Sequence, residues 1–362
     1  MDIEGGLIGW LQSHRAELRL SVRATTAGVL AYLVATLLNL PQGYWAVFTA
    51  IIVMQASVGG SVKTGLDWFV GTLGGGVLGV AIATLVPDHD FWTRTGAIAL
   101  AIAPLALLAA VHASFRVAPI TAVIVVLGLN PELSPLMSAF DRVLEIAVGS
   151  LIGVGVSLVV LPARAHGLAA VAAGQALAMC AALMTVLLEA ASAGVAVMDT
   201  APLHDALRRA LTRFEALTEE AGRERATRLS TEPDTEPLAR TLRRLRSDLV
   251  MINRAAAVPL PQDVAARLAP AILHVARAGV AFLTDCATAL RDRKAAPSLA
   301  GVEIAMAEFT TALAASRQAG IIRELPDDAV GRVFTLGFVI EQLVQNFKDL
   351  ANRTHELARE RP

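Results

Sequence analysis

Arg142 and Glu145 are the residues of this sequence whose types and spacing most directly suggest chemistry. They stand three positions apart at the start of a stretch that carries no further charge before Arg164, so on a helix they share one face. An ionisable side chain at membrane depth is costly and is a candidate functional residue by default. Arg142 would then hold a carboxylate, while Glu145 would orient that ligand or take up a proton. The alternative is a structural i,i+3 ion pair near the outer interface.

Five other residues complete the candidate substrate path. Lys63 and Arg116 flank the expected inner mouth, where they either screen entering anions or anchor helices at the lipid headgroups. Trp45 lies at the end of an expected span, where aromatic residues also serve as interface anchors. Thr49 and Gln55 are polar residues of the same short span. They either line the path or form hydrogen bonds between helices.

The sequence contains no motif for catalysis, metal binding or direct use of ATP. Gly74, Gly76 and Gly79 match G-x-G-x-x-G, but they lie inside an expected span, whereas a dinucleotide site needs a strand before them. H-E-x-x-H, G-x-S-x-G and G-x-x-x-x-G-K-[ST] do not occur. We therefore expect neither an enzyme nor a bound metal or cofactor.

The density of charge changes abruptly near Pro162 and divides the chain in two. Residues 1–162 contain 16 Lys, Arg, Asp and Glu, whereas residues 163–362 contain 47. Uncharged runs of the first part approach the length that crosses about 30 Å of hydrocarbon, and a backbone in lipid must satisfy its own hydrogen bonds. The sequence predicts an all-α membrane protein. Residues 1–162 would form a six-span transmembrane bundle, and residues 163–362 a cytoplasmic helical bundle.

The six predicted spans cover about residues 22–40, 43–58, 68–87, 95–111, 117–130 and 143–161. With the N-terminus inside, the basic residues of the loops segregate. The inner ones are Arg15, Arg19, Arg23, Lys63, Arg116 and Arg164, and the outer ones are Arg94 and Arg142. This asymmetry follows the positive-inside rule and predicts that both termini are cytoplasmic. No cleavage site for a signal peptide follows the first span.

The third and sixth spans resemble each other in sequence. Asp67–Gly79 aligns with Asp141–Gly153, so that Gly75 corresponds to Gly149 and Gly79 to Gly153. Because three spans separate the two segments, they would belong to an inverted 3+3 repeat, an arrangement known among transporters. The alternative is that these residues and Gly71 only allow close helix packing in lipid.

The second and fifth spans are the shortest, and they hold corresponding places in the two halves. The fifth also has Pro119 near its start. Short or interrupted segments at matching positions point to a substrate path. Tilting or partial re-entry without functional meaning is the alternative.

The second half of the chain is expected to be helical throughout. Proline-containing turns delimit the segments 165–198, 202–229, 237–257, 262–294, 300–324 and 327–360. Gly167–Leu188 carries no charge over 22 residues and could form a seventh span, which would place the C-terminal domain outside the cell. Its many alanines and the central Gln175 favour a packed helix of a soluble bundle.

The net charge and the number of cysteines limit the kinds of partner and cross-link that the sequence suggests. The net charge of −1 gives no argument for nucleic acid. Cys180 and Cys286 are the only two cysteines, which argues against a disulfide framework.

The stretch from Tyr44 to Gly76 reads YWAVFTAIIVMQASVGGSVKTGLDWFVGTLGGG. It resembles the fusaric acid resistance family of bacterial inner-membrane proteins, which includes the aromatic acid exporters. It is also similar to the plant aluminium-activated malate transporters. The segment from Arg142 to Pro162 and the tail around Gln342–Leu350 share the resemblance. The family often has a basic residue just before Gly-Thr, where this chain has Asp67 and Trp68.

The resemblance implies export or channelling of small organic anions, aromatic acids among them, across the inner membrane. It also implies a cytoplasmic helical domain. Longer members carry two such halves in one chain, so this half-length chain is expected to form a homodimer in the lipid bilayer. A periplasmic adaptor protein is a further partner that the resemblance suggests.

Three functions remain open at this point: an exporter of organic acids, an anion channel gated by the cytoplasmic domain, and a membrane scaffold without transport. A coupled exporter needs a titratable group such as Glu145. A channel needs only fixed positive charge along its path. A scaffold would tolerate the loss of Arg142, Glu145 and Lys63.

Overall fold

The structure, a computed structural model, describes residues 15–86, 91–128, 134–162, 164–197, 199–226, 230–323 and 325–358. In this part of the chain every regular element is a helix, which confirms the predicted all-α class. The chain divides into two compact units, residues 1–164 and 165–362. Asp88, Asp90 and Glu132, which the predicted topology puts in the outer loops beside Arg94 and Arg142, lie outside the described residues.

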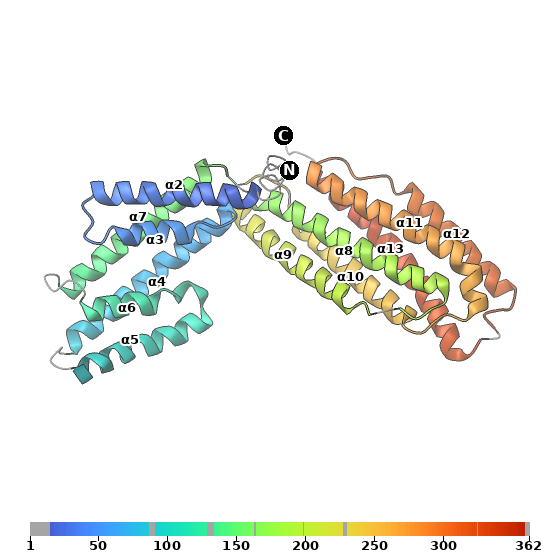
Figure 1. Cartoon of the computed structure of the whole chain (residues 1–362), viewed down its shortest axis with the longest axis horizontal. Coiled ribbons are helices and arrows are strands. Elements are labelled where there is room, and N and C mark those ends of the chain that lie inside the picture. Colours follow the sequence, from blue (N-terminus) through green and yellow to red (C-terminus); the bar gives the residue numbers. More distant parts are fainter. Residues whose placement is uncertain are drawn as a thin grey trace, which may run out of the picture. The chain divides into compact units, whose positions relative to one another are not determined.

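The first unit is a bundle whose helices lie side by side, with α2 at one edge and α5 at the other (Figure 1). Its described helices are α2 (Arg15–Leu37), α3 (Tyr44–Val53), α4 (Val58–Leu85), α5 (Phe91–Val111), the short 3-10 helix η1 (Ala113–Phe115), α6 (Ala118–Leu127) and α7 (Pro135–Val159).

The short helices α3 and α6 are even shorter than the spans predicted at 43–58 and 117–130. Each has 10 residues, which at 1.5 Å per residue is about half of the hydrocarbon thickness. Helix α4, by contrast, begins ten residues before the predicted third span. Ser57 caps it, since its side chain accepts a hydrogen bond from the backbone amide of Gly60.

Six of the described helices are long and apolar enough to cross a membrane. Four of them, α2, α4, α5 and α7, belong to the first unit. The other two, α8 and α11, belong to the second unit, whereas the prediction took all six spans from the first. The difference arises because α3 and α6 are too short to cross by themselves.

Small residues bring the helices of the first unit close together. On α2, Ala27, Ala31 and Ala35 recur every fourth residue and are buried, so they form one stripe on the helix face. The outward surface of the unit is apolar. Of the exposed large hydrophobic side chains in the described residues, all but six lie in this unit. A surface of this kind is suited to lipid.

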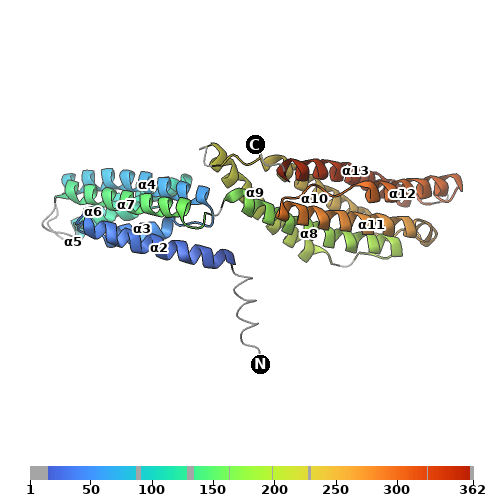
Figure 2. The same ribbon diagram turned by 90° about the horizontal axis from the view of Figure 1, so that it is seen from above.

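The second unit is a bundle of long helices that run lengthwise beside one another (Figures 1 and 2). Its described helices are α8 (Ala165–Ala193), α9 (Ala201–Ala226), α10 (Glu236–Ala256), α11 (Gln262–Asp292), α12 (Ala300–Gln318) and α13 (Asp327–Ala358). They agree with the predicted segments to within a few residues, except that α12 ends at Gln318. One hydrophobic core runs through all six, and both cysteines are buried and free within it.

Helix α8 lies along α9, α10 and α11 and buries its apolar face in that core. Cys180, Leu183, Met184, Leu187 and Leu188 are almost inaccessible. The helix is thus apolar because its neighbours in the unit cover it.

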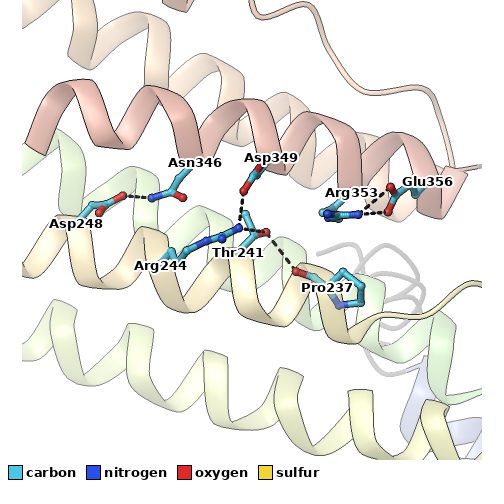
Figure 3. Close-up of polar contacts among 8 residues, drawn as sticks. All are labelled: Pro237, Thr241, Arg244, Asp248, Asn346, Asp349, Arg353 and Glu356. Carbon is cyan, nitrogen blue, oxygen red and sulfur yellow. Dashed lines mark hydrogen bonds and ion pairs between the residues drawn. The ribbon is translucent and has the colours of Figure 1, made fainter.

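A polar seam joins α10 to α13 at one side of the core (Figure 3). The side-chain amide of Asn346 donates a hydrogen bond of 2.6 Å to Asp248, and both residues are buried. Arg244 pairs with Asp349 at the exposed edge. Burial raises the pKa of Asp248 above its usual range, and the hydrogen bond from Asn346 and the charge of Arg244 only partly oppose this effect.

We expect Asp248→Asn to stabilise the second unit at neutral pH. When folding raises the pKa of a carboxyl, the folded protein loses stability as the pH rises from the pKa of the unfolded state through that of the folded state. The protein with the ionised carboxyl is therefore the less stable one. Asparagine keeps the acceptor for Asn346 without the charge. The expected gain is about 1 kcal/mol, or a rise of roughly 2–4 °C in Tm, and it should vanish below about pH 4, near the unfolded pKa of an Asp. Hydrogen exchange of the α10 and α13 amides against pH measures it. A lower stability of the variant at pH 7 would contradict this account.

Candidate anion site of the membrane unit

Arg142 and Glu145 lie in the second and third turns of α7. The helix begins with Ser134, whose side chain accepts a hydrogen bond from the amide of Met137, and with Pro135 in its first turn. Both charged side chains are buried: Arg142 is 4% and Glu145 1% exposed. The nearest approach between them is 3.8 Å, from Nη1 of Arg142 to Oε2 of Glu145. The ion pair is therefore enclosed within the unit.

The guanidinium of Arg142 stacks on the indole of Trp45. Its Cζ lies 3.3 Å from the centroid of the ring, a cation–π contact that is strong when shielded from water. Trp45 itself belongs to an aromatic group with Tyr44 and Phe48, whose ring centroids lie 5.4–6.1 Å apart. The structure thus joins two predicted path residues, Arg142 and Trp45, in one site.

Gln42 holds Glu145 and the aromatic residues in place. Its backbone amide donates a 2.8 Å hydrogen bond to Oε1 of Glu145. Its side-chain oxygen accepts hydrogen bonds from Nε1 of Trp45 at 3.2 Å and from the hydroxyl of Tyr44 at 3.3 Å. Gln42 was not among the predicted path residues, yet it connects Trp45 to Glu145, because the turn between α2 and α3 brings it there.

The guanidinium retains unused hydrogen-bonding capacity. Nε and Nη1 of Arg142 are buried and have no hydrogen-bond partner, although buried polar groups are normally paired. Guanidinium groups bind carboxylates through two parallel hydrogen bonds. An arginine beside aromatic rings can therefore take the carboxylate of an aromatic acid, with Glu145 as the competing internal carboxylate.

Lys63 and Arg116 do not join this site. Gly65, two residues after Lys63, faces Val154 and Ser150. Val154 is twelve residues along α7 from Arg142, or about 18 Å. Lys63 is exposed and pairs with Asp67 at 2.9 Å, and Arg116 is exposed. These two cations thus lie at the opposite end of the unit from Arg142.

Asp67, which stands where the family often has a basic residue, accepts a 2.6 Å hydrogen bond from Ser114. This bond fastens α4 to η1, whereas the ion pair to Lys63 lies within α4. The carboxylate thus joins two elements of the unit, and it leaves Lys63 with a paired charge.

Thr49 and Gln55 lie at different places on α3 and beyond its end. Thr49 is buried, and its hydroxyl has no hydrogen-bond partner. The side chain of Gln55 donates to the carbonyl of Ile52 at 2.9 Å, and its backbone amide donates to Ser61 at 3.0 Å. Gln55 therefore closes the turn between α3 and α4, whereas Thr49 faces the interior of the bundle.

The glycines of α4 bring that helix against η1 and α6. An added Cβ at each would meet the backbone or side chain of a facing residue: Gly71 faces Ser114, Gly75 faces Ala118, and Gly79 faces Ala122. The contact at Gly75 is the closest, because a Cβ there would collide with the carbonyl oxygen of Ala118.

The glycines of α7 do the same against α3. A Cβ at Gly149 would lie 2.8 Å from Cβ of Thr49 and 3.0 Å from Cα of Ala46, and one at Gly153 would lie 3.0 Å from the carbonyl of Ala50. Helices α4 and α7 also pack on each other. Their repeated glycines nevertheless face the two short helices.

Arg23 is a buried cation that the sequence analysis placed among the inner-loop charges. The structure places it on α2 with 1% of its surface exposed. A signal was present in the sequence: Arg23 stands one turn before Ala27, on the stripe that continues through Ala31 and Ala35. Extending that stripe back by four residues would have placed Arg23 on the buried face.

Comparison with known proteins agrees with this architecture. Residues 30–156 match the family described as fusaric acid resistance protein-like. The chain is 36% identical over 80 residues to the uncharacterized transporter YdhK of Escherichia coli strain K12, which covers 22% of this chain and 11% of that protein. It is 29% identical over 172 residues to the uncharacterized transporter YdhK of Salmonella typhimurium strain LT2, which covers 44% and 24%.

The matched region thus spans at most about a quarter of the length of these relatives. The family match over residues 30–156 lies within the first unit, which carries the buried Arg142. The chain is a multi-pass membrane protein, and residues 30–156 of its first unit match the fusaric acid resistance protein-like family.

Proposed function

We propose that this protein is a transporter that exports small organic or aromatic carboxylic acids across the bacterial inner membrane. The observation that carries the proposal is the guanidinium of Arg142, which is buried on the face of Trp45 with two nitrogens, Nε and Nη1, that have no hydrogen-bond partner among the described residues. The family of the membrane domain and the relatives named as transporters support it.

In the proposed mechanism the carboxylate of the substrate and Glu145 compete for Arg142. While Glu145 is ionised, it neutralises the guanidinium at 3.8 Å. When Glu145 takes up a proton, the positive charge is released for the substrate. Proton binding and anion binding would then favour each other, so that a proton and the carboxylate leave together, driven by the outward gradient of the acid.

An organic-anion channel gated by the second unit is the alternative function. The hydrogen bond from the amide of Gln42 favours the channel, because a carboxylate that accepts this bond can position Arg142 without taking up a proton. The path would then need no proton. A membrane scaffold without transport is the remaining alternative, and the unused N–H groups of a buried arginine speak against it.

We also propose that the membrane unit is an inverted 3+3 repeat. In support, α4 faces α6 through Gly75 and Gly79 as α7 faces α3 through Gly149 and Gly153. The facing residues correspond in type as well. The pairs are Ala46 with Ala118, Thr49 with Thr121, Ala50 with Ala122, and Val53 with Val125, all of them buried.

The repeat would place two short helices in corresponding positions of the two halves. The hydroxyls of Thr49 and Thr121 are both buried without a hydrogen-bond partner. Substrate paths of inverted-repeat transporters lie between such elements, so the two threonines are the expected polar lining of the middle of the path.

We propose that neither α8 nor α11 crosses the membrane and that both termini are cytoplasmic. Support comes from the neighbours of α8, which packs along α9, a helix with ten charged residues among 26. Such a helix cannot enter hydrocarbon, where each charged side chain is costly. The loop charges support this orientation. The proposed partners are the lipid bilayer, a second copy of the chain in a homodimer, and a periplasmic adaptor protein.

Cysteine labelling tests this topology, and the burial of both native cysteines keeps the background low. We expect a membrane-impermeant maleimide to label Leu38→Cys in intact cells but Ser298→Cys only after lysis. Both positions are exposed, one after α2 and the other between α11 and α12. Labelling of Ser298→Cys in intact cells would mean that either α8 or α11 crosses the membrane.

Transport itself is tested with purified protein in liposomes. We expect uptake and release of radiolabelled benzoate and other aromatic acids to depend on the protein and to respond to a pH gradient. Flux that needs the protein but ignores the gradient would favour the channel. The absence of flux for aromatic and dicarboxylic acids alike would contradict organic-anion transport.

A further inference from the structure

Arg23 carries a buried positive charge that none of the described residues neutralises. Its side chain is 1% exposed, and the one hydrogen bond that it forms with a described residue is long, at 3.5 Å from Nη1 to the carbonyl of Ala56. Nε and Nη2 have no partner. No ion pair within the part of the chain that the structure describes joins Arg23 to a carboxylate.

This environment differs from that of the other buried arginine in the unit. Arg142 has Glu145 at 3.8 Å and Trp45 beneath it, so its pair carries no net charge while Glu145 is ionised. Arg23 lies next to the apolar cluster of Ala27, Met54 and Val156 and keeps its full charge. A buried guanidinium without a partner is strongly unfavourable, which indicates that a ligand completes the site.

The backbone around Ala56 adds to the attraction for an anion. Helix α3 ends at Val53, Met54 is extended, and α4 begins at Val58. Arg23 therefore points to the gap between two helices, next to the N-terminal end of α4. The dipole of a helix is positive at this end, so it favours an anion at the same place as the guanidinium.

We propose that Arg23 is an anion-binding residue that receives the carboxylate of the substrate at the inner end of the path. The proposal rests on the proposed transport function and specifies a second site within it. Helix α3 has 10 residues, about 15 Å, with Trp45 in its first turn and Ala56 just beyond its end. One buried guanidinium thus stands near each end of α3, with Thr49 between them.

The decisive variant is Arg23→Met, which removes the charge and keeps a long side chain that fits an apolar pocket. If Arg23 awaits a ligand, this variant is more stable than the wild type without ligand, because an unsatisfied charge has gone. If Arg23 only caps the end of α3, the variant is less stable. Arg19→Gln is the matched control, since Arg19 lies one turn earlier on α2 and is exposed.

The experiment measures three properties of the full chain: Tm in detergent without ligand, the rise in Tm with benzoate, and benzoate flux in liposomes. For Arg23→Met we expect a higher Tm without ligand, and a half-saturating benzoate concentration raised about tenfold or more, as the loss of charged hydrogen bonds implies. Arg23→Lys should lie in between, and Arg19→Gln should match the wild type.

The possible outcomes distinguish the proposed anion site at Arg23 from the proposed transport function. Benzoate binding that requires Arg23, without any flux, would keep the site and remove the transport function. Flux with unchanged half-saturation in Arg23→Met would keep transport and overturn the site. A lower Tm of Arg23→Met with unchanged benzoate binding would show that Arg23 is structural. A wild type that neither binds nor transports benzoate would overturn both proposals.

Discussion

Gly149→Ala is expected to destabilise the membrane unit strongly, although it adds only one methyl group. That carbon would collide with the carbonyl oxygen of Ala46 and lie 2.8 Å from Cβ of Thr49, so α7 and α3 would have to separate. Overpacking of this kind costs about 1–3 kcal/mol, and a collision with backbone leaves no rotamer by which to escape. Gly75→Ala should have the same effect between α4 and α6. Thermal unfolding in detergent measures both.

The control lies on the same helix as Gly149. A Cβ at Gly155 meets nothing within 4 Å, so Gly155→Ala should leave stability unchanged or raise it by up to about 1 kcal/mol, the difference in helix propensity. The same added methyl group is therefore expected to lower the free energy of unfolding at Gly149 but not at Gly155. Equal effects of the two substitutions would contradict close packing of α7 on α3.

Arg142→Ala is expected to reduce benzoate flux at least about tenfold, because the loss of charge-assisted hydrogen bonds is worth roughly 1.5–3 kcal/mol. The single variant also leaves Glu145 buried without its cation, which by itself destabilises a protein. The double variant Arg142→Ala with Glu145→Gln removes that complication, since both charges are absent. We expect the double variant to regain stability without regaining flux.

Glu145→Gln alone tests the coupling to protons. Glutamine can still accept the hydrogen bond from the amide of Gln42, and it imitates the protonated carboxyl. The variant should therefore bind benzoate as the wild type does at low pH, and its flux should no longer vary with pH. Flux that returns in the double variant would show that Arg142 serves only to balance Glu145, and the anion path would then have to be sought at Arg23.

The sequence by itself determined the class of the protein and most of its helices. The low charge density before Pro162 and the long uncharged runs follow from the cost of burying charge in lipid. This signal is carried by neighbouring residues in the chain and needs no knowledge of tertiary contacts. The helices of the second unit could also be predicted from the sequence, because prolines and capping residues mark their ends. The spacing of Arg142 and Glu145 likewise fixed their common helix face.

Tertiary structure alone decided which residues meet. Sequence spacing could not bring Trp45 beneath Arg142 or the amide of Gln42 to Glu145, since about a hundred residues separate the partners. The same holds for the glycines, which were recognisable as packing residues although the helices that they face were not. Arg23 shows the limit most clearly. Its charge suggested a loop, but burial depends on which neighbours cover a helix face, and the packing of α2 places Arg23 inside the unit.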